Sequence, residues 1–155
     1  GGIVPPWDCP YCPPKQMFRS TLPSMPATEP EAILDWFASA HPKSAVILTL
    51  GADGAWYSDA AVRRYQSAVP TKAVDTTAAG DSFTGGFLYG LLQGCTPIEE
   101  RSADQIRDML TFANAVGAHC VAAVGATAGI RSIDETLDFM RRADAAKIKE
   151  RKFYT

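Results

Sequence analysis

The feature of this chain that most constrains its fold is a run of small residues between two acids, DTTAAGD at residues 75–81, which continues as SFTGGFL through residue 88. Ala73 and Val74 before it predict the end of a β-strand, and the apolar stretch after it predicts a helix over residues 80–93. A helix that begins directly after a bare turn presents free backbone N–H groups and the positive end of its dipole, and both favour anions. With Asp81 as a base beside them, these groups form the arrangement that phosphoryl transfer requires.

Asp81 also has a simpler interpretation, because acidic residues are favoured in the first turn of any helix, where they complement the dipole. The small side chains of residues 78–80 count against a plain cap, since they let a bulky anion approach the amides directly. The glycines at residues 85–86 leave the next helical turn without side chains as well. The whole strand–turn–helix segment therefore indicates an anion site more strongly than Asp81 alone does.

Composition and charge exclude several classes of function. With 155 residues, 46% hydrophobic and 21% charged, the chain has room for one ordinary globular domain with a sizeable core. Its net charge of −2 provides no electrostatic footprint for nucleic acid or for an anionic membrane surface. The sequence has no apolar run of membrane-spanning length and no signal segment, so we expect a cytoplasmic protein without nucleic-acid or membrane partners.

Residues 1–30 differ from the rest because they hold eight of the eleven prolines. Proline interrupts helices and central strands, so this stretch is predicted to be a loop-like leader. Order is expected to begin at the capping-box pattern of residues 28–31, which has proline in its first turn and leads into a helix over residues 32–40. Residues 31–155 are predicted to form the ordered unit that contains the opening segment.

The remaining pattern predicts strands early and long helices late. Residues 45–50 are a continuous apolar run, typical of a strand that is covered on both faces. A turn is expected at residues 51–54, followed by strands at 55–58 and 62–65, and residues 71–74 lead into the opening segment. Helices are expected over 80–93, ended by Gly94, and over 102–123, capped by Ser102. A loop at 125–129 and a C-terminal helix, which begins with a capping box at 132–135, complete the chain. This order, without an internal repeat, predicts an α/β sheet layered with helices.

The cysteines provide a competing signal. Cys9-Pro10-Tyr11-Cys12 is similar to the glutaredoxin active-site tetrapeptide, but two prolines follow it where a helix would have to begin. A zinc site would need a second ligand pair, and His41 and His119 are isolated in the sequence. We interpret the pair as coincidental, and a redox role would require Cys9 to react with a thiol probe at unusually low pH. Cys95 and Cys120 are expected to be buried as small hydrophobic residues, and His119 to face its neighbours in a helix.

The DTTAAGD segment, with the SFTGG that follows, resembles the D-T-x-G-A-G-D signature of the PfkB-type carbohydrate kinases, the ribokinase family. The resemblance covers about residues 45–140 and the C-terminal half of such enzymes, with Ala78 where glycine is commoner. It implies a ribokinase-like three-layer sheet with helices on both faces, of which this chain supplies part. Residues 31–155 would then be the C-terminal nucleotide-binding and catalytic part of such a kinase domain. The resemblance also implies an ATP-dependent sugar kinase in which Asp81 is the catalytic base and the backbone N–H groups of Ala78, Ala79 and Gly80 form the anion hole.

The same resemblance implies a nucleotide site. The segment at residues 49–54 is similar to the family's T-x-G-x-x-G, which lines the nucleotide phosphates, and Asn114 matches a position near the adenine; the implied residues are Thr49, Gly51, Ala52, Gly54 and Asn114. Taken alone, residues 49–54 are equally consistent with a plain hairpin turn. Magnesium would arrive with ATP, because the sequence shows no dedicated set of ligands for it.

A monovalent cation site is implied in the same way. Asp75, Thr77 and Gly125 fall where family members bind a cation such as potassium. Asp75 is equally consistent with a structural acid at the end of a strand. The expected cofactors are therefore ATP with Mg²⁺, and K⁺ as a further expectation.

Family members are about twice as long as this chain, and their N-terminal half supplies the sugar-binding residues and a lid sheet. Nothing in residues 1–44 resembles that half, so the chain is interpreted as a fragment or a truncated product. The expected substrate is a sugar such as ribose, fructose or 2-keto-3-deoxygluconate, and a homodimer is an expectation for the full-length enzyme only. The alternative is a non-catalytic remnant of a kinase that acts as a structural or interaction module.

Overall fold

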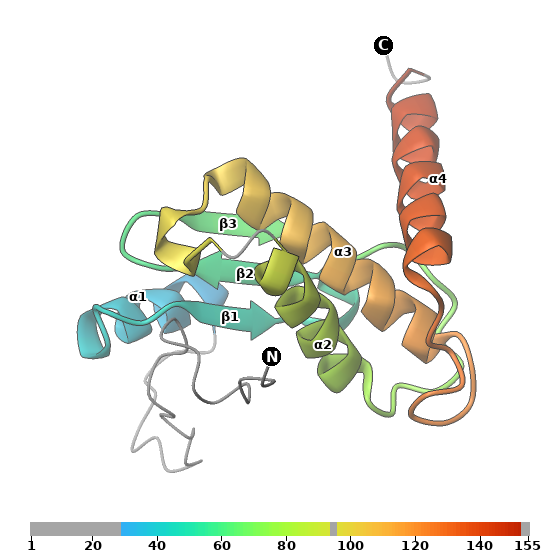
Figure 1. Cartoon of the computed structure of the whole chain (residues 1–155), viewed down its shortest axis with the longest axis horizontal. Helices are drawn as coiled ribbons and strands as arrows, with labels where there is room; N and C mark the ends of the chain where they lie inside the picture. Colours follow the sequence, from blue (N-terminus) through green and yellow to red (C-terminus); the bar gives the residue numbers. More distant parts are fainter. Residues whose placement is uncertain (1–28, 94–95, 153–155) are drawn as a thin grey trace, which may run out of the picture.

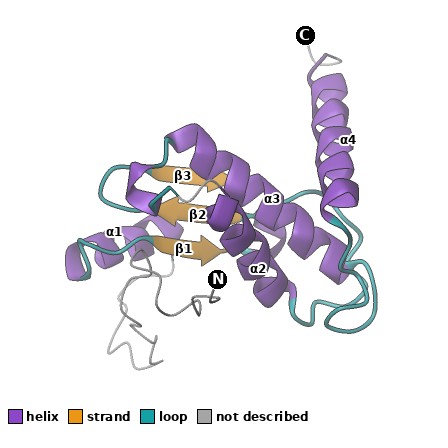
Figure 2. Cartoon of the chain, in the orientation of Figure 1, coloured by secondary structure: helices purple, strands orange, loops and turns teal. Residues whose placement is uncertain are grey.

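The computed structural model describes residues 29–93 and 96–152. Helices and strands follow one another as Figure 1 shows, and Figure 2 separates the strands from the helices around them. In chain order the elements are α1 (Pro30–Ala40), β1 (Val46–Thr49), the 3-10 helix η2 (Gly51–Asp53), β2 (Ala55–Ser58), β3 (Arg63–Gln66), α2 (Ala79–Leu92), the 3-10 helix η4 (Ile98–Glu100), α3 (Ala103–Val121) and α4 (Ile133–Lys152). Within these residues no helix is both long and apolar enough to cross a membrane.

The strands form one antiparallel sheet in the order β1-β2-β3. Val46 pairs with Ser58 at one end of the first hairpin, and Thr49 pairs with Ala55 at the other end, where η2 makes the turn. The predicted hairpin is therefore confirmed. The expected burial of its first strand on both faces is wrong, because β1 lies at the edge of the described sheet with Val46 half-buried and Thr49 exposed.

The strand expected before the small-residue turn is also absent. The described chain contains no strand between β3 and α2, and the N–H groups of Val74 and Asp75 both donate to the carbonyl of Val121, at 2.7 and 3.2 Å. This segment runs across the C-terminal end of α3 instead of pairing with a strand. Only Ala73 and Val74 of residues 71–74 are apolar, and this short segment does not indicate which backbone partner it will pair with.

The hydrophobic core lies between the sheet and the helices α2 and α3. Its buried side chains come from the central strand and from both helices, namely Ala55, Tyr57, Phe83, Phe87, Ile106, Met109, Leu110 and Ala113. α2 packs along α3, and α1 packs on β1 and β2 behind the sheet in the view of Figure 1. The chain is therefore layered as α/β, which the sequence predicted.

Glycines let α2 and α3 approach closely. A Cβ atom at position 86 would lie 3.0 Å from the Cα atom of Ala113, and one at position 90 would lie 2.9 Å from Cγ of Met109. Gly85, on the other hand, faces open space. Of Gly85 and Gly86, which were both predicted to keep this helical turn free of side chains, only Gly86 is required by packing.

Local capping signals place the helix starts. Ser102 Oγ accepts the N–H of Gln105, and the Gln105 side chain accepts the N–H of Ser102. Ser132 and Glu135 form the second reciprocal pair, as predicted. α1 begins at Pro30 with Glu29 as N-cap and no side-chain cap bond. Thr28, Gly94, Cys9, Cys12, Cys95 and residues 1–28 of the predicted leader lie outside the described residues.

Candidate functional site

The turn before α2 leaves several backbone donors free. Ala78 is the N-cap of α2 and has a left-handed conformation with φ 60° and ψ 15°. The N–H of Ala79 donates to the carbonyl of Thr76 at 3.2 Å, and the N–H of Ser82 makes the first helical bond to the carbonyl of Ala78 at 2.9 Å. Within the described residues, the N–H groups of Ala78 and Gly80 have no acceptor.

Asp81 lies in the first turn of α2 with an exposed side chain. No hydrogen bond or ion pair engages its carboxylate in the described part of the chain, and its own N–H is free as well. A Cβ atom at position 80 would have no neighbour within 4 Å, so among the described residues the space beside Gly80 is open. The free donors are therefore those of Ala78, Gly80 and Asp81, whereas the predicted set was Ala78, Ala79 and Gly80.

That difference has a local cause. A tight turn closes with a bond from the residue after it, and here this bond uses the N–H of Ala79. The N–H of Asp81 remains free because the first four N–H groups of a helix have no intrahelical partner. The helix start predicted at residue 80 already places Asp81 among these first N–H groups, so the sequence could have identified it.

Asp75 joins two loops. Its Oδ1 accepts the N–H of Thr77 at 2.9 Å, and its Oδ2 accepts the N–H of Gly125 at 2.8 Å. Hydrogen bonds from Thr77, and then from the Gly125 backbone, lower the pKa of Asp75 to about 2 from the ordinary 3.8. The structure thus brings together the three predicted cation residues through direct bonds. It favours a structural role for Asp75, although as a link between loops and not at the end of a strand.

The turn at residues 49–54 is shaped by its glycines. Gly51 and Gly54 have φ angles of +58° and +116°, and a Cβ atom at position 54 would lie 2.1 Å from the carbonyl oxygen of Gln66. Gly54 is therefore required by packing. Gly51 faces open space, and Thr49 and Ala52 are exposed, so this side of the turn is free to meet a ligand.

Asn114 lies buried on α3, facing the end of β3. Its Nδ2 donates to the carbonyls of Gln66 and Ser67, both at 3.3 Å. Gly54 packs on the same segment, so the structure does bring Asn114 and the turn at residues 49–54 together. Nδ2 therefore has two carbonyl acceptors, which leaves Oδ1 as the polar side-chain atom that could meet a ligand.

Two further predicted residues lie in the last turns of α3. Cys120 is fully buried, as expected. The ring of His119 lies 4.6 Å from that of Phe139 on α4, and its Nε2 is buried without a partner among the described residues. Burial lowers the pKa of His119, which fits a neutral packed ring. In the described chain no three His, Cys, Asp or Glu residues are grouped to hold a metal ion.

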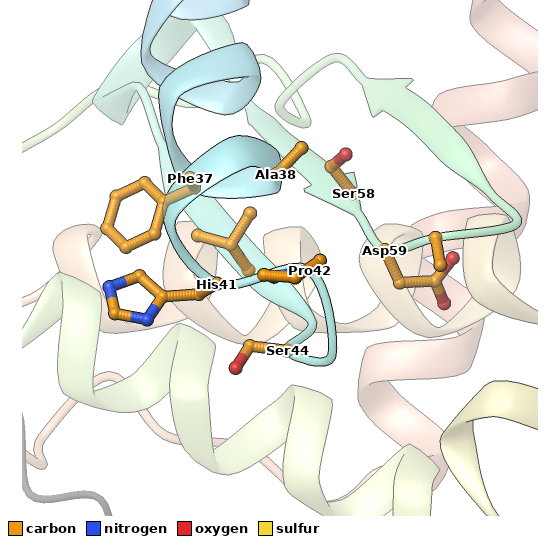
Figure 3. A pocket seen from close by; sticks show the side chains of 9 residues that line it. Phe37, Ala38, His41, Pro42, Ser44, Ser58 and Asp59 are labelled. Atoms are coloured by element: carbon orange, nitrogen blue, oxygen red, sulfur yellow. The ribbon is translucent and has the colours of Figure 1, made fainter.

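Figure 3 shows a pocket of about 140 Å³ between the end of α1 and the first hairpin, lined by Phe37, His41 and Asp59 among others. It lies at the Val46–Ser58 end of the hairpin, away from the turn at residues 49–54. The Asp59 carboxylate there already accepts the hydroxyl of Tyr57 at 2.5 Å, and burial raises the pKa of that hydroxyl. None of the predicted site residues lines this pocket.

A second pocket, of about 270 Å³, lies along α2 directly beyond Asp81. Its walls include Ser82, Gly85 and Tyr89 of α2 and Phe112 of α3. The open turn at the start of α2 therefore borders a hollow surface.

The fold and this turn define an α/β protein with a helix N-terminus open to an anion. The sequence profile of the pfkB family carbohydrate kinases matches residues 16–133, and the chain belongs to this family. The resemblance stated from the sequence is thereby confirmed, and so is the ribokinase-like fold, of which the chain covers part.

Individual relatives agree. The ribokinase of Haemophilus influenzae (strain ATCC 51907 / DSM 11121 / KW20 / Rd) is 39% identical over 98 residues, which are 63% of this chain and 29% of that protein. A putative ribokinase II from E. coli in complex with ATP and Mg²⁺ is 29% identical with a TM-score of 0.61, over 76% of this chain and 35% of the other. A double mutant of the fructokinase from Vibrio cholerae O395, in its fructose-, ADP- and potassium-bound form, is 29% identical with a TM-score of 0.59, over 71% and 34%. The chain thus spans about a third of the length of these relatives.

Proposed function

We propose that this chain carries the phosphoryl-transfer part of an ATP-dependent sugar kinase, which moves the γ-phosphoryl group of ATP to a sugar hydroxyl. The observation that supports it most is the first turn of α2. There the free N–H groups of Ala78 and Gly80 and the free carboxylate of Asp81 belong to one short segment. The family membership supports the same reaction class.

In this proposal Asp81 accepts the proton of the sugar hydroxyl as the sugar oxygen bonds to the γ-phosphorus. The bond between that phosphorus and the β–γ bridging oxygen breaks, and ADP leaves. The N–H groups of Ala78, Gly80 and Asp81 stabilise the charge on the transferring group, because a helix N-terminus favours anions without any rearrangement. Magnesium bound to the ATP phosphates would neutralise part of their charge.

The nucleotide is proposed to lie across the turn at residues 49–54, where Gly51 leaves the backbone open. Asn114, which shares the packing segment of that turn, would offer Oδ1 to the base. A potassium ion near Asp75, Thr77 and Gly125 remains a proposal, supported by the potassium-bound fructokinase among the related structures. We also propose a sugar substrate such as ribose, fructose or 2-keto-3-deoxygluconate, a homodimer for the full-length enzyme, and a cytoplasmic location.

The test is phosphotransfer by the complete gene product with Asp81→Asn. We expect a loss of turnover of about a hundredfold or more, because asparagine cannot accept the proton. Binding of a non-hydrolysable ATP analogue should stay within about twofold of wild type, since the amides remain. An asparagine variant with full turnover would overturn the assignment of the base.

A second candidate function is a non-catalytic module that binds another protein. The exposed apolar side chains of α2 favour it, since Leu88 is 49% and Leu92 is 74% exposed. Calorimetric titration of the folded chain with a non-hydrolysable ATP analogue separates the two candidates. Saturable heat supports the kinase, and a folded chain without any binding supports the module.

A further inference from the structure

The thiol of Cys120 lies between two loops. The residue is fully buried in the last turn of α3, and its Sγ is 3.4 Å from the carbonyl oxygen of Thr77 and 3.5 Å from that of Ala126. Thr77 belongs to the loop before α2, and Ala126 belongs to the loop after α3. One S–H group is therefore shared between two carbonyls that lie far apart in the sequence.

Asp75 joins the same two loops as a hydrogen-bond acceptor, whereas Cys120 joins them as a donor. Its carboxylate accepts the N–H groups of Thr77 and Gly125, whereas the thiol donates to the carbonyls of Thr77 and Ala126. Both backbone polar groups of Thr77 therefore have a partner: the carbonyl accepts from the buried thiol, and the N–H donates to the Asp75 carboxylate on the exposed side. The second loop is seated tightly as well, because a Cβ atom at position 129 would lie 2.8 Å from Cα of Cys120.

The Thr77 carbonyl shares its peptide unit with the N–H of Ala78. The unit is trans, as the described part of the chain contains no cis peptide bond, so the C=O and the N–H point in opposite directions. A carbonyl turned inward to the Cys120 thiol therefore turns the Ala78 N–H outward. That N–H is one of the free donors of the open turn.

We infer that Cys120 is a positioning residue, whose thiol holds the Thr77 carbonyl and thereby directs the Ala78 N–H toward a bound phosphate. The inference rests on the proposed function for the identity of the anion. The hydrogen bond by which the buried thiol holds the Thr77 carbonyl can be tested without a ligand.

The test compares Cys120→Ser, which keeps a hydroxyl donor, with Cys120→Val, which keeps an apolar side chain without a donor. Amide hydrogen exchange of the full chain without ligand is measured at Thr77 and Gly125, whose N–H groups are bound by Asp75. We expect exchange at both to be faster by about threefold or more in the valine variant, the factor that corresponds to one weak hydrogen bond, and close to wild type in the serine variant. Urea unfolding of both variants corrects for changes in global stability.

Binding of a non-hydrolysable ATP analogue and of inorganic phosphate gives the second readout. A fall in affinity of about threefold with valine, rescued by serine, supports the inference. Equal exchange rates in the two variants overturn it, whatever the affinities are. If the wild type binds neither probe, the proposed function fails, and the exchange rates alone then decide whether the thiol helps to hold the two loops in place.

Discussion

At the scale of single residues, backbone conformation and hydrogen bonding explain the open turn. Ala78 adopts a left-handed conformation that disfavours side chains, and Asp75 uses both carboxylate oxygens to fix the neighbouring loops. The sequence predicted that Ala78 and Asp75 belong to the site, but not the conformation of Ala78 or the hydrogen bonds of Asp75. The handedness of Ala78 and the partner of Asp75, fifty residues away at Gly125, depend on contacts that no local pattern contains.

Replacing Ala78 by valine should destabilise the fold. A left-handed conformation costs an L-residue roughly 1–2 kcal/mol, and a β-branched side chain is the least tolerant of it. Ala78→Gly removes that strain but makes the unfolded chain more flexible, so its stability should stay within about 1 kcal/mol of wild type. Urea unfolding measures both. The matched control is Ala40→Val at the exposed end of α1, and equal stability of the valine and glycine variants at position 78 would refute the strain.

Asp75 should make stability depend on acid pH. The pKa of Asp75 in the folded chain is about 2, below the ordinary 3.8, so its ionised form stabilises the fold above about pH 4 and this contribution is lost as the pH falls toward 2. Asp75→Asn should lack this part of the pH dependence. The measurement is the urea midpoint between pH 6 and pH 2, with the exposed Asp134→Asn on α4 as control. Parallel curves for wild type and Asp75→Asn would contradict the assignment.

At the scale of elements, the close packing of α2 on α3 positions the turn. The helices themselves were predictable, because Ser102 and the Ser132–Glu135 pair are local signals that α3 and α4 obey. The strand expected at residues 71–74 was not, because a strand exists only where a neighbouring backbone pairs with it.

Adjacent glycines of α2 should respond oppositely to alanine. Gly86→Ala places a methyl group 3.0 Å from the Cα atom of Ala113, and this overpacking should cost about 1–3 kcal/mol. Gly85→Ala meets nothing within 4 Å, so it should stabilise the helix by about 0.5–1 kcal/mol. Thermal or urea unfolding of the two variants, measured side by side, tests the packing. Similar changes at both positions would mean that α2 does not pack as described.

At the scale of the whole molecule, the chain is one part of a kinase fold. It spans about a third of the length of its relatives, and its exposed apolar side chains Leu88 and Leu92 lie on the helix that carries Asp81. The family and the α/β class could be read from the signature segment and the order of elements. The burial of β1 could not, because it depends on what lies beside the edge of the sheet.

The first turn of α2 is proposed to bind the phosphates of a nucleotide. An NMR titration of the chain with a non-hydrolysable ATP analogue tests it most directly, through the amide shifts of Ala78, Gly80 and Asp81. We predict saturable shifts at these three amides and none at Ser44, which lines the pocket of Figure 3. Binding that shifts other amides and leaves these three unchanged would contradict the claim.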